Sequence, residues 1–354
     1  MKILIDDGLS SLYNLTGIGH HGYNLYIHLK QFCECEITNY WYLKFIPRGL
    51  RKFTYEGCTN LHSLYRRFEI IHYQNHNLPY ISGHAKRVVT IHDLSVYRFP
   101  ETVPTIYIKH NQSLIFHSIK MADAIITPSE FTKEEIIDCF PEAKYKGIYS
   151  CEVGLRDIFF EEDVRSDIFI DNNLLHYSYF FFIGSISKRK NLEFLLTAFT
   201  KAKENGTIRK DTKLVLGGQN WWGASNINKM INSNLDIISL GYLSDSDIIN
   251  LYRYSKAVIF PSIYEGFGMP IIEAMSQNAP LIISDIPTSI KLNERHGNQM
   301  FMFKLGNEPS LMKILNNLDK NFESIKSKLN YNDISIYRYE NIAKRHLEVY
   351  NTLL

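Results

Sequence analysis

The chain has 354 residues, which is enough for two domains that each bury a hydrophobic core of their own. Its 45% of hydrophobic and 21% of charged residues are typical of an ordinary soluble globular protein. The formal net charge of +2 excludes any argument from global charge for a nucleic acid partner.

The chain begins directly with the strand-like segment Lys2–Asp6, without a charged region followed by an apolar stretch, so we expect no signal peptide. No run reaches the roughly 18 to 20 apolar residues that a membrane-spanning helix needs. Five cysteines form no disulfide framework, and Cys33 and Cys35 are too close for a Cys-x-x-Cys site. We expect a cytoplasmic protein with at most peripheral contact to the inner face of the plasma membrane.

Short apolar runs alternate with helical patterns over nearly the whole length. Because these runs are apolar throughout and not alternating, they predict parallel strands buried on both faces. The predicted strands are Lys2–Asp6, Ile70–Tyr73, Val88–Ile91, Ala124–Thr127, Tyr179–Ile183, Lys213–Leu216, Asp236–Leu240, Ala257–Phe260 and Leu281–Ser284. Repeated strand–helix units of this kind indicate the α/β class with doubly wound sheets.

Two further features stand out in the first half. The segment Thr16–Gly19 places Gly17 and Gly19 before a predicted helix, a position where glycines also occur for steric reasons. The basic and aromatic segment Trp41–Phe53 is compatible with contact to an anionic membrane surface. A partly buried connection between strands explains that segment equally well.

The polar stretch Phe160–His176 separates two series of strand–helix units, and we interpret it as a linker. The sequence therefore predicts two Rossmann-like domains, residues 1–165 and 166–335. The segment Tyr339–Leu354 has the pattern of an amphipathic terminal helix. We expect residues 336–354 to pack back on the N-terminal domain.

The segment Phe182–Asn191 combines a glycine with two cations. Gly184 follows a predicted strand, and Arg189 and Lys190 stand just before a predicted helix. The negative charge of a leaving diphosphate has to be met by fixed cations or by a metal ion. Arginine can bind two phosphate oxygens at once, and lysine supplies a mobile point charge. A solvated basic turn explains this segment equally well when it is considered alone.

The segment Pro261–Gln277 carries two carboxylates around a glycine turn. Glu265 lies in a loop after a predicted strand, and Glu273 lies about one turn into the following helix, which Pro270 helps to begin. The two glycines allow close approach of a ligand to the backbone amides. Carboxylates and amides together favour a ligand rich in hydroxyl groups, such as a sugar or a ribose.

Asp245 and Asp247 have the Asp-x-Asp spacing of some metal-dependent enzymes. They come directly before a helical pattern, so helix capping and the helix dipole explain them more simply. The histidines show no spacing typical of zinc ligands. We expect no metal ion and no cofactor.

These motifs together resemble glycosyltransferase family 4, a retaining group with the GT-B fold, in which two Rossmann-like domains face each other across a cleft. Glu265 and Glu273 match the family's E-x7-E element, and Arg189 and Lys190 match its phosphate-binding pair. The resemblance extends to three short segments of the second half: Gly217–Gly218, Gly241–Ser244 and Pro261–Ser262.

The resemblance also implies roles for individual residues. It implies an active site with His92, Arg189, Lys190 and Glu265 as its catalytic residues. Glu273 would bind the ribose, and Tyr242 and Leu243 would border the base. The donor site would also include Gly17, Gly19, Gly184, Gly266, Phe267, Gly268 and Met269. Many family members carry an arginine where this chain has His20.

The expected function is transfer of a hexose, with retention, from a nucleotide sugar to a lipid-linked or other glycan acceptor. The resemblance is strongest to the mannosyltransferases of bacterial surface polysaccharides, such as O-antigen, so we expect mannose from GDP-mannose. UDP-hexoses and dTDP-rhamnose remain alternatives. The competing functions are a nucleotide-sugar epimerase or hydrolase on the same scaffold and a non-catalytic sugar-nucleotide binding protein.

Overall fold

A computed structural model of the chain describes residues 1–6, 17–38, 45–80 and 83–354. These residues form two compact units. Unit 1 comprises residues 1–98, 105–156 and 336–354, and unit 2 comprises residues 99–104 and 157–335. The division after residue 156 falls earlier than the boundary predicted at residue 165, and residues 336–354 return to the first unit.

Unit 1 contains a parallel sheet whose described strands are arranged in the order β2-β1-β3-β4-β5-β6. The strands are β1 Lys2–Asp6, β2 Glu34–Ile37, β3 Ile70–Tyr73, β4 Lys86–Thr90, β5 Ala124–Thr127 and β6 Gly147–Ser150. The helices are α1 Gly17–Leu29, α2 Arg48–Arg66, α3 Ser95–Arg98, α4 Thr105–Met121, α5 Glu130–Cys139 and α13 Tyr339–Asn351.

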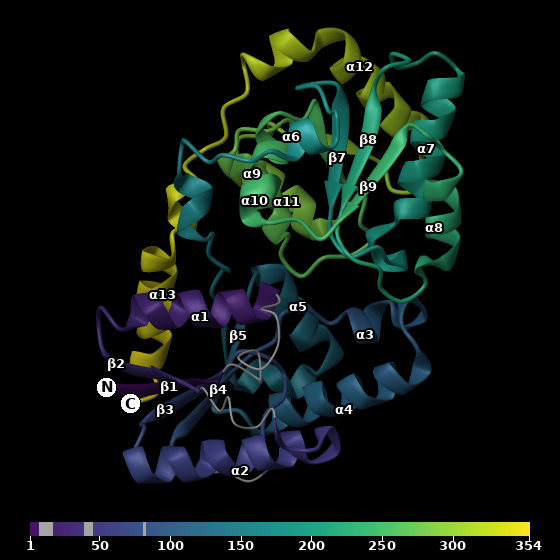
Figure 1. The fold of residues 1–354 in the computed structure, drawn as a ribbon. Helices are drawn as coiled ribbons and strands as arrows, with labels where there is room; N and C mark the ends of the chain where they lie inside the picture. Colours follow the sequence, from purple (N-terminus) through teal and green to yellow (C-terminus); the bar gives the residue numbers. More distant parts are fainter. Residues whose placement is uncertain (7–16, 39–44, 81–82) are drawn as a thin grey trace. The chain divides into compact units, whose positions relative to one another are not determined.

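The last helix, α13, is part of the core of unit 1. Its residues Tyr339, Ile342 and Tyr350 are buried in the same hydrophobic cluster as Leu25 of α1 and Ile3 of β1. Helices α13 and α1 therefore share one face of the sheet, and α2 lies on the other side (Figure 1). No described helix is both long and apolar enough to cross a membrane.

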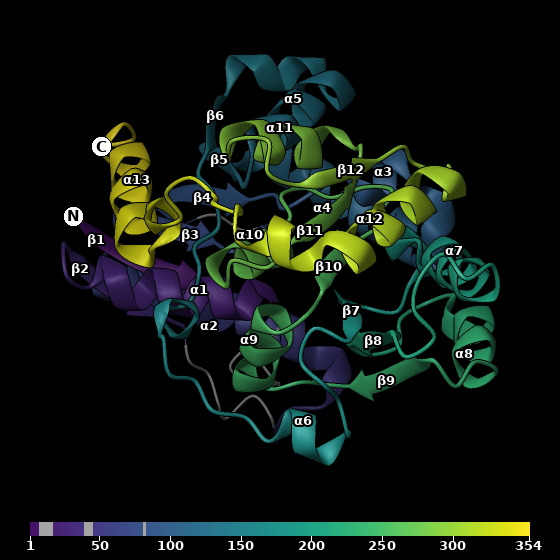
Figure 2. The same ribbon diagram turned by 90° about the horizontal axis from the view of Figure 1, so that it is seen from above.

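Unit 2 contains a second parallel sheet, whose described strands are arranged in the order β12-β11-β10-β7-β8-β9. The strands are β7 Tyr179–Ile183, β8 Lys213–Gly217, β9 Ile237–Gly241, β10 Ala257–Phe260, β11 Leu281–Ser284 and β12 Phe301–Phe303. The helices are α6 Ile168–Asp171, α7 Leu192–Glu204, α8 Ala224–Asn232, α9 Asp245–Arg253, α10 Met269–Ser276, α11 Pro287–Arg295 and α12 Glu308–Lys326. Helices α7, α8 and α12 pack on one face of this sheet, and α9 and α10 lie on the other side of β7 (Figure 2).

Six of the nine predicted strands agree with the structure at both ends, and the other three differ by one or two residues. Three strands were not predicted: β2, β6 and β12. Each of them lies at an edge of its sheet. An edge strand needs no continuous apolar run, because it is covered less completely by neighbouring elements.

The predicted linker, Phe160–His176, is instead an ordered part of unit 2. The Ser166 hydroxyl donates to Oδ1 of Asp247 at 2.5 Å, and Arg253 donates to the Glu162 carbonyl oxygen at 2.6 Å. Both partners lie in α9, so this polar stretch packs on unit 2 through hydrogen bonds. Its polar composition reflects those contacts and not a free connection.

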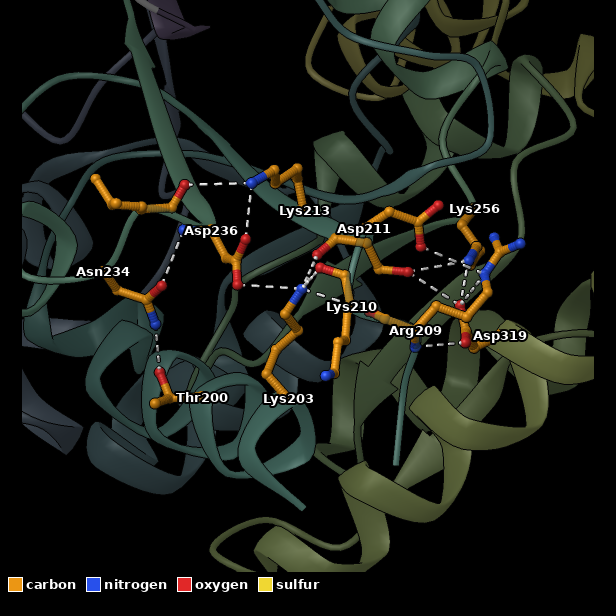
Figure 3. A network of polar contacts seen from close by, with 12 residues as sticks. Thr200, Lys203, Arg209, Lys210, Asp211, Lys213, Asn234, Asp236, Lys256 and Asp319 are labelled. Carbon is orange, nitrogen blue, oxygen red and sulfur yellow. Dashed lines mark hydrogen bonds and ion pairs between the residues drawn. The ribbon is translucent and has the colours of Figure 1, made fainter. Parts of the chain in front are cut away.

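Charged side chains hold the amino ends of the strands in unit 2 (Figure 3). Lys213 at the start of β8 donates to Asp236 before β9 at 2.7 Å. Lys256, just before β10, forms a buried ion pair with Asp319 of α12. Asp319 also accepts the Arg209 backbone N–H at 2.9 Å. This network leaves the opposite edge, formed by the carboxyl ends of the strands, for a binding site.

Candidate functional site

Hydrogen bonds between four glycines connect the carboxyl ends of β7, β8 and β9. The Gly184 N–H donates to the Gly217 carbonyl oxygen at 3.0 Å, and the Gly218 N–H donates to the Gly241 carbonyl oxygen at 2.6 Å. Gly218 has a φ of +128°, and a Cβ there would lie 1.9 Å from the Gly184 carbonyl oxygen. Only glycine fits this position, which lies at the edge where open α/β sheets bind ligands.

The loop after β7 carries both predicted cations. It continues into a short helical turn, Lys188–Lys190, and Asn191 adopts a left-handed conformation before α7 begins. The Lys190 side chain passes over Gly184, where a Cβ would lie 3.5 Å from its Cε. The Ile263 N–H donates to the Arg189 carbonyl oxygen at 3.1 Å. That bond joins the loop after β7 to the loop after β10.

Arg189 and Lys190 both bind Glu265 of the neighbouring loop. Arg189 Nη1 donates to Glu265 Oε2 at 3.0 Å and also to the Tyr264 carbonyl oxygen at 3.0 Å. Lys190 Nζ donates to Glu265 Oε1 at 2.5 Å. Each carboxylate oxygen of Glu265 thus faces one cation, so two predicted phosphate ligands and one predicted sugar ligand form a single cluster.

The two cations change the acidity of this carboxyl group. Burial alone raises the pKa of Glu265, but attraction to Lys190 and Arg189 and hydrogen bonds from Lys190 and Ser262 outweigh it and lower the pKa to about 2. The side chain is therefore ionised at neutral pH and is a weak base. The cluster carries one net positive charge from these three residues, which favours an anionic ligand.

The loop after β10 turns into α10 at Gly268. Gly268 has a φ of +102° and caps the helix, with Pro270 in its first turn as predicted. Glu273 lies on α10, and its Oε2 accepts the Tyr252 hydroxyl at 3.1 Å. Tyr252 lies in α9 and is fully buried, so its hydroxyl holds one oxygen of Glu273 from the protein interior. Nothing in the local sequence around Tyr252 indicated this role.

The remaining predicted donor residues of unit 2 differ in exposure. Tyr242 is 75% exposed, whereas Leu243 is buried and packs on Gly217. Phe267 is also buried. Gly266 precedes it in the loop, and Met269 is the first residue of α10. Of the two residues predicted to border the base, only Tyr242 has a mostly exposed side chain.

In unit 1, His92 follows β4 and lies in a partly buried position. Its Nε2 donates to the Gln74 carbonyl oxygen at 2.8 Å. Burial lowers the pKa of His92, and the Gln74 carbonyl and Asp93 oppose this only in part. Asp93 accepts the Ser95 N–H at 2.9 Å and braces the loop. His92 is therefore a neutral imidazole with a fixed orientation.

The predicted glycine loop is only partly described. Gly17 opens α1 with free space around it, and Gly19 is buried. Thr16 lies outside the described residues, as do residues 41–44 of the basic and aromatic segment Trp41–Phe53. The structure therefore gives the place of both glycines but not the conformation of the loop before them.

Two helices begin with a side-chain cap, and the one at the start of α9 confirms the predicted capping role of its acidic segment. The Ser129 side chain accepts the Thr132 N–H at the start of α5. Ser244 and Asp247 form a reciprocal capping box at the start of α9. The Asp-x-Asp spacing at Asp245 therefore serves the helix terminus, as its position before a helical pattern indicated.

Two family models match separate parts of the chain. The model described as "Glycosyl transferases group 1" matches residues 165–327, and "Glycosyltransferase Family 4" matches residues 29–150. The first region contains the cluster of Arg189, Lys190 and Glu265, and the second contains His92.

Two curated relatives are similar over most of the chain. O-antigen chain mannosyltransferase B of Escherichia coli is 28% identical over 222 residues, which are 61% of this chain and 57% of the relative. O-antigen chain mannosyltransferase RfbU of Salmonella typhimurium is 25% identical over 274 residues, 76% of this chain and 70% of the relative. The match to the first therefore spans less than two thirds of that relative's length.

Solved structures resemble the whole chain. Sucrose-phosphate synthase from Thermosynechococcus elongatus has a TM-score of 0.74 at 15% identity, and the match covers 100% of this chain and 99% of that chain. Anabaena HepE, solved in complex with UDP-glucose, has a TM-score of 0.72 at 15% identity, covering 99% of this chain and 100% of that chain. At this identity the likeness concerns the fold, and it confirms the predicted GT-B class with two parallel α/β units.

Proposed function

Because the chain carries a group 1 glycosyltransferase domain and a glycosyltransferase family 4 domain, we propose that it transfers a hexose from a nucleoside diphosphate sugar to an acceptor hydroxyl. The observation that carries the proposal is the cluster of Arg189, Lys190 and Glu265 at the carboxyl edge of the sheet in unit 2. Two cations held by one carboxylate suit a ligand that brings two phosphates and a sugar.

The diphosphate of the donor would bind Arg189 and Lys190. Arginine can offer two parallel N–H groups to phosphate oxygens, and lysine adds a point charge. When the bond between the anomeric carbon and the phosphate oxygen breaks, the electron pair stays on the diphosphate and these cations stabilise it. Fixed cations supply the charge that a metal ion supplies elsewhere, so we expect activity without a divalent metal.

The proposed mechanism is a front-side displacement with retention. The acceptor oxygen forms a bond to the anomeric carbon while the bond to the leaving phosphate breaks on the same face. The acceptor proton passes to a phosphate oxygen of the leaving group. Glu265 is a poor nucleophile and base, because both of its oxygens face cations and its pKa is about 2. This favours a mechanism that needs no enzyme nucleophile.

The other donor contacts follow from the family roles and the observed positions. Glu273 would bind the ribose with one oxygen held by Tyr252. The amides near Phe267 and Gly268, together with Glu265, would contact the sugar. Tyr242 is exposed beside the end of β9 and would border the base.

For the substrates, mannose from GDP-mannose and a lipid-linked glycan acceptor are the preferred pair. The support is the resemblance to two O-antigen mannosyltransferases. A UDP-hexose is the main alternative donor, because the similar Anabaena protein was solved with UDP-glucose. Both alternatives use the same diphosphate cluster, so that cluster does not distinguish them.

A lipid-linked acceptor would bring the protein to the inner face of the plasma membrane. Exposed apolar side chains lie on and just before α2, and they are suited to peripheral contact with a bilayer surface. These residues are Phe45, Leu50, Leu61, Leu64 and Tyr65.

The function is tested by incubating the purified protein with each nucleotide sugar, with and without a lipid-linked acceptor. A transferase forms a glycosylated acceptor and releases nucleoside diphosphate slowly without it, and NMR of the product shows whether the anomeric configuration is retained. An epimerase converts the donor without acceptor, a hydrolase releases free sugar, and a binding protein turns over nothing. Any of these three outcomes contradicts the proposal.

A further inference from the structure

Three buried polar side chains in unit 1 form one hydrogen-bonded group. His72 lies in β3, Gln74 follows that strand, and Tyr350 lies in α13 near the end of the chain. Their exposed fractions are 0%, 2% and 0%. We call these three residues the Gln74 network. Within this group the Gln74 amide nitrogen has a partner, whereas its Oε1 is buried without a hydrogen-bond partner.

The bonds of the network fix the tautomer of His72. The Tyr350 hydroxyl lies 2.6 Å from His72 Nδ1, and the Gln74 amide nitrogen lies 3.0 Å from the same atom. An amide nitrogen can only donate, so Nδ1 accepts and Nε2 carries the proton. Nε2 lies 2.8 Å from Thr90 Oγ1, to which it donates.

The Gln74 side chain is confined on a second side by α1. A Cβ added at Gly22 would lie 3.0 Å from Gln74 Cγ, so the glutamine stem rests directly on the backbone of that helix. The amide end is held by His72, and the backbone N–H donates to the Asp6 carbonyl oxygen at 3.4 Å. The side chain and the main chain of Gln74 are both restrained. These restraints also fix the direction of the main-chain carbonyl group of Gln74.

The main-chain carbonyl group of Gln74 orients His92. It accepts from Nε2 of His92 at 2.8 Å, and because a carbonyl oxygen cannot donate, Nε2 must carry the proton. In the neutral ring Nδ1 is then the acceptor. Such an atom can receive a hydrogen bond from a sugar hydroxyl but repels an ionised phosphate.

We propose that Gln74, His72 and Tyr350 are positioning residues that hold His92 as the Nε2–H tautomer, so that Nδ1 is left as the acceptor for a sugar hydroxyl of the substrate. The tautomer and its support are properties of the ligand-free protein. Only the contact with the sugar rests on the proposed function. Through Tyr350, the C-terminal helix α13 contributes to the orientation of a residue more than two hundred positions earlier in the chain.

The first test is nitrogen NMR of the histidine rings in the ligand-free protein, with the His92 signals identified by their loss in His92→Gln. We expect the Nε2–H tautomer for His92 in the wild type. Gln74→Leu and Tyr350→Phe should shift or broaden these signals. The matched control is Tyr331→Phe, which removes a buried hydroxyl that donates to the Ala279 carbonyl oxygen in unit 2. Unchanged His92 signals in both network variants would overturn the proposal.

The second test measures whether the network acts through His92. Gln74→Leu should lower kcat about tenfold with a smaller change in KM, since a slight misplacement of a contact group slows the reaction. In a His92→Gln background the same substitution should have no further effect, because the group that it positions is gone. An equal loss in both backgrounds means that Gln74 acts on the fold instead, and refutes the proposal.

The two tests separate this inference from the proposed function. If the NMR signals respond as expected but the protein shows no transfer, the network is supported and the proposed function fails. If transfer occurs and depends on Lys190 while the His92 signals do not respond, the proposed function stands and the network is refuted.

Discussion

Replacing Glu265 by glutamine tests the charge balance of the proposed donor site. The substitution keeps the size of the side chain but removes the negative charge that faces Arg189 and Lys190 at 3.0 and 2.5 Å. We expect Glu265→Gln to destabilise the protein at neutral pH. The free energy of unfolding should fall because the variant lacks the interaction with the two cations that lowers the pKa of this carboxyl group.

The magnitude follows from the pKa shift. A fall from 4.5 to about 2 corresponds to about 3 kcal/mol of stability. Because the folded-state pKa lies below the unfolded value, this contribution is fully present above the unfolded pKa. It is lost as the pH falls through the folded pKa. The difference between wild type and variant should therefore be about 3 kcal/mol at pH 7 and less than half of that at about pH 3.

Urea unfolding of both proteins at the two pH values measures this difference. The matched control is Glu308→Gln, which breaks the more exposed pair with Lys201 and should cost at most about 1 kcal/mol. A difference for Glu265→Gln that is the same at both pH values would refute the reasoning, because it would not depend on ionisation of the carboxyl group.

Three further substitutions test the scaffold in unit 2. Gly218→Ala should prevent correct folding, because its Cβ would lie 1.9 Å from a backbone atom. The control Gly206→Ala, whose Cβ has no neighbour within 4 Å, should cost only about 1 kcal/mol of stability. Thermal unfolding and expression of soluble protein distinguish the two variants. Asp319→Ala leaves Lys256 buried without its partner and should cost about 3 to 5 kcal/mol in urea unfolding, and a loss below 1 kcal/mol would show that the pair is not effectively buried. Ser244→Ala removes the cap of α9 and should cost about 1 kcal/mol by the same measurement, while an unchanged midpoint would contradict the capping box.

All but one of the strands that the sequence predicted have a neighbouring strand on each side, and the exception is the edge strand β9. Tyr179–Ile183 and Ala257–Phe260 are central, apolar throughout and buried. By contrast, β2 contains Glu34 and Glu36, and β12 has only three residues. Hydrophobic runs identify a strand only when burial demands them, so edge strands leave a weak signal.

The candidate site was predictable where its residues lie close in sequence to the end of a strand. Arg189, Lys190 and Glu265 each follow a recognisable strand, and parallel strands bring such loops to one edge. The supporting residues were not predictable in this way. Tyr252 and Gln74 act through contacts with residues 21 and 18 positions away in the chain, and no local pattern marks those contacts.

The polar stretch Phe160–His176 shows a second limit of sequence interpretation. Its charged composition suggested a linker. A segment that is exposed to water and a segment that is hydrogen-bonded to its own domain have similar compositions. The partners that make it part of unit 2, Asp247 and Arg253, lie far along the sequence. Composition alone cannot distinguish polar groups that face water from polar groups that face another helix.

The central claim is that Arg189, Lys190 and Glu265 form the diphosphate end of a nucleotide-sugar site. Thermal unfolding of the wild type and of Lys190→Ala, recorded across GDP-mannose, UDP-hexoses and dTDP-rhamnose, tests it most directly. A ligand that binds only the folded state at a hundred times its Kd stabilises that state by about 2.7 kcal/mol. We expect one donor to raise the Tm of the wild type clearly and to have little effect on Lys190→Ala. A flat response of the wild type to every nucleotide sugar would contradict the account.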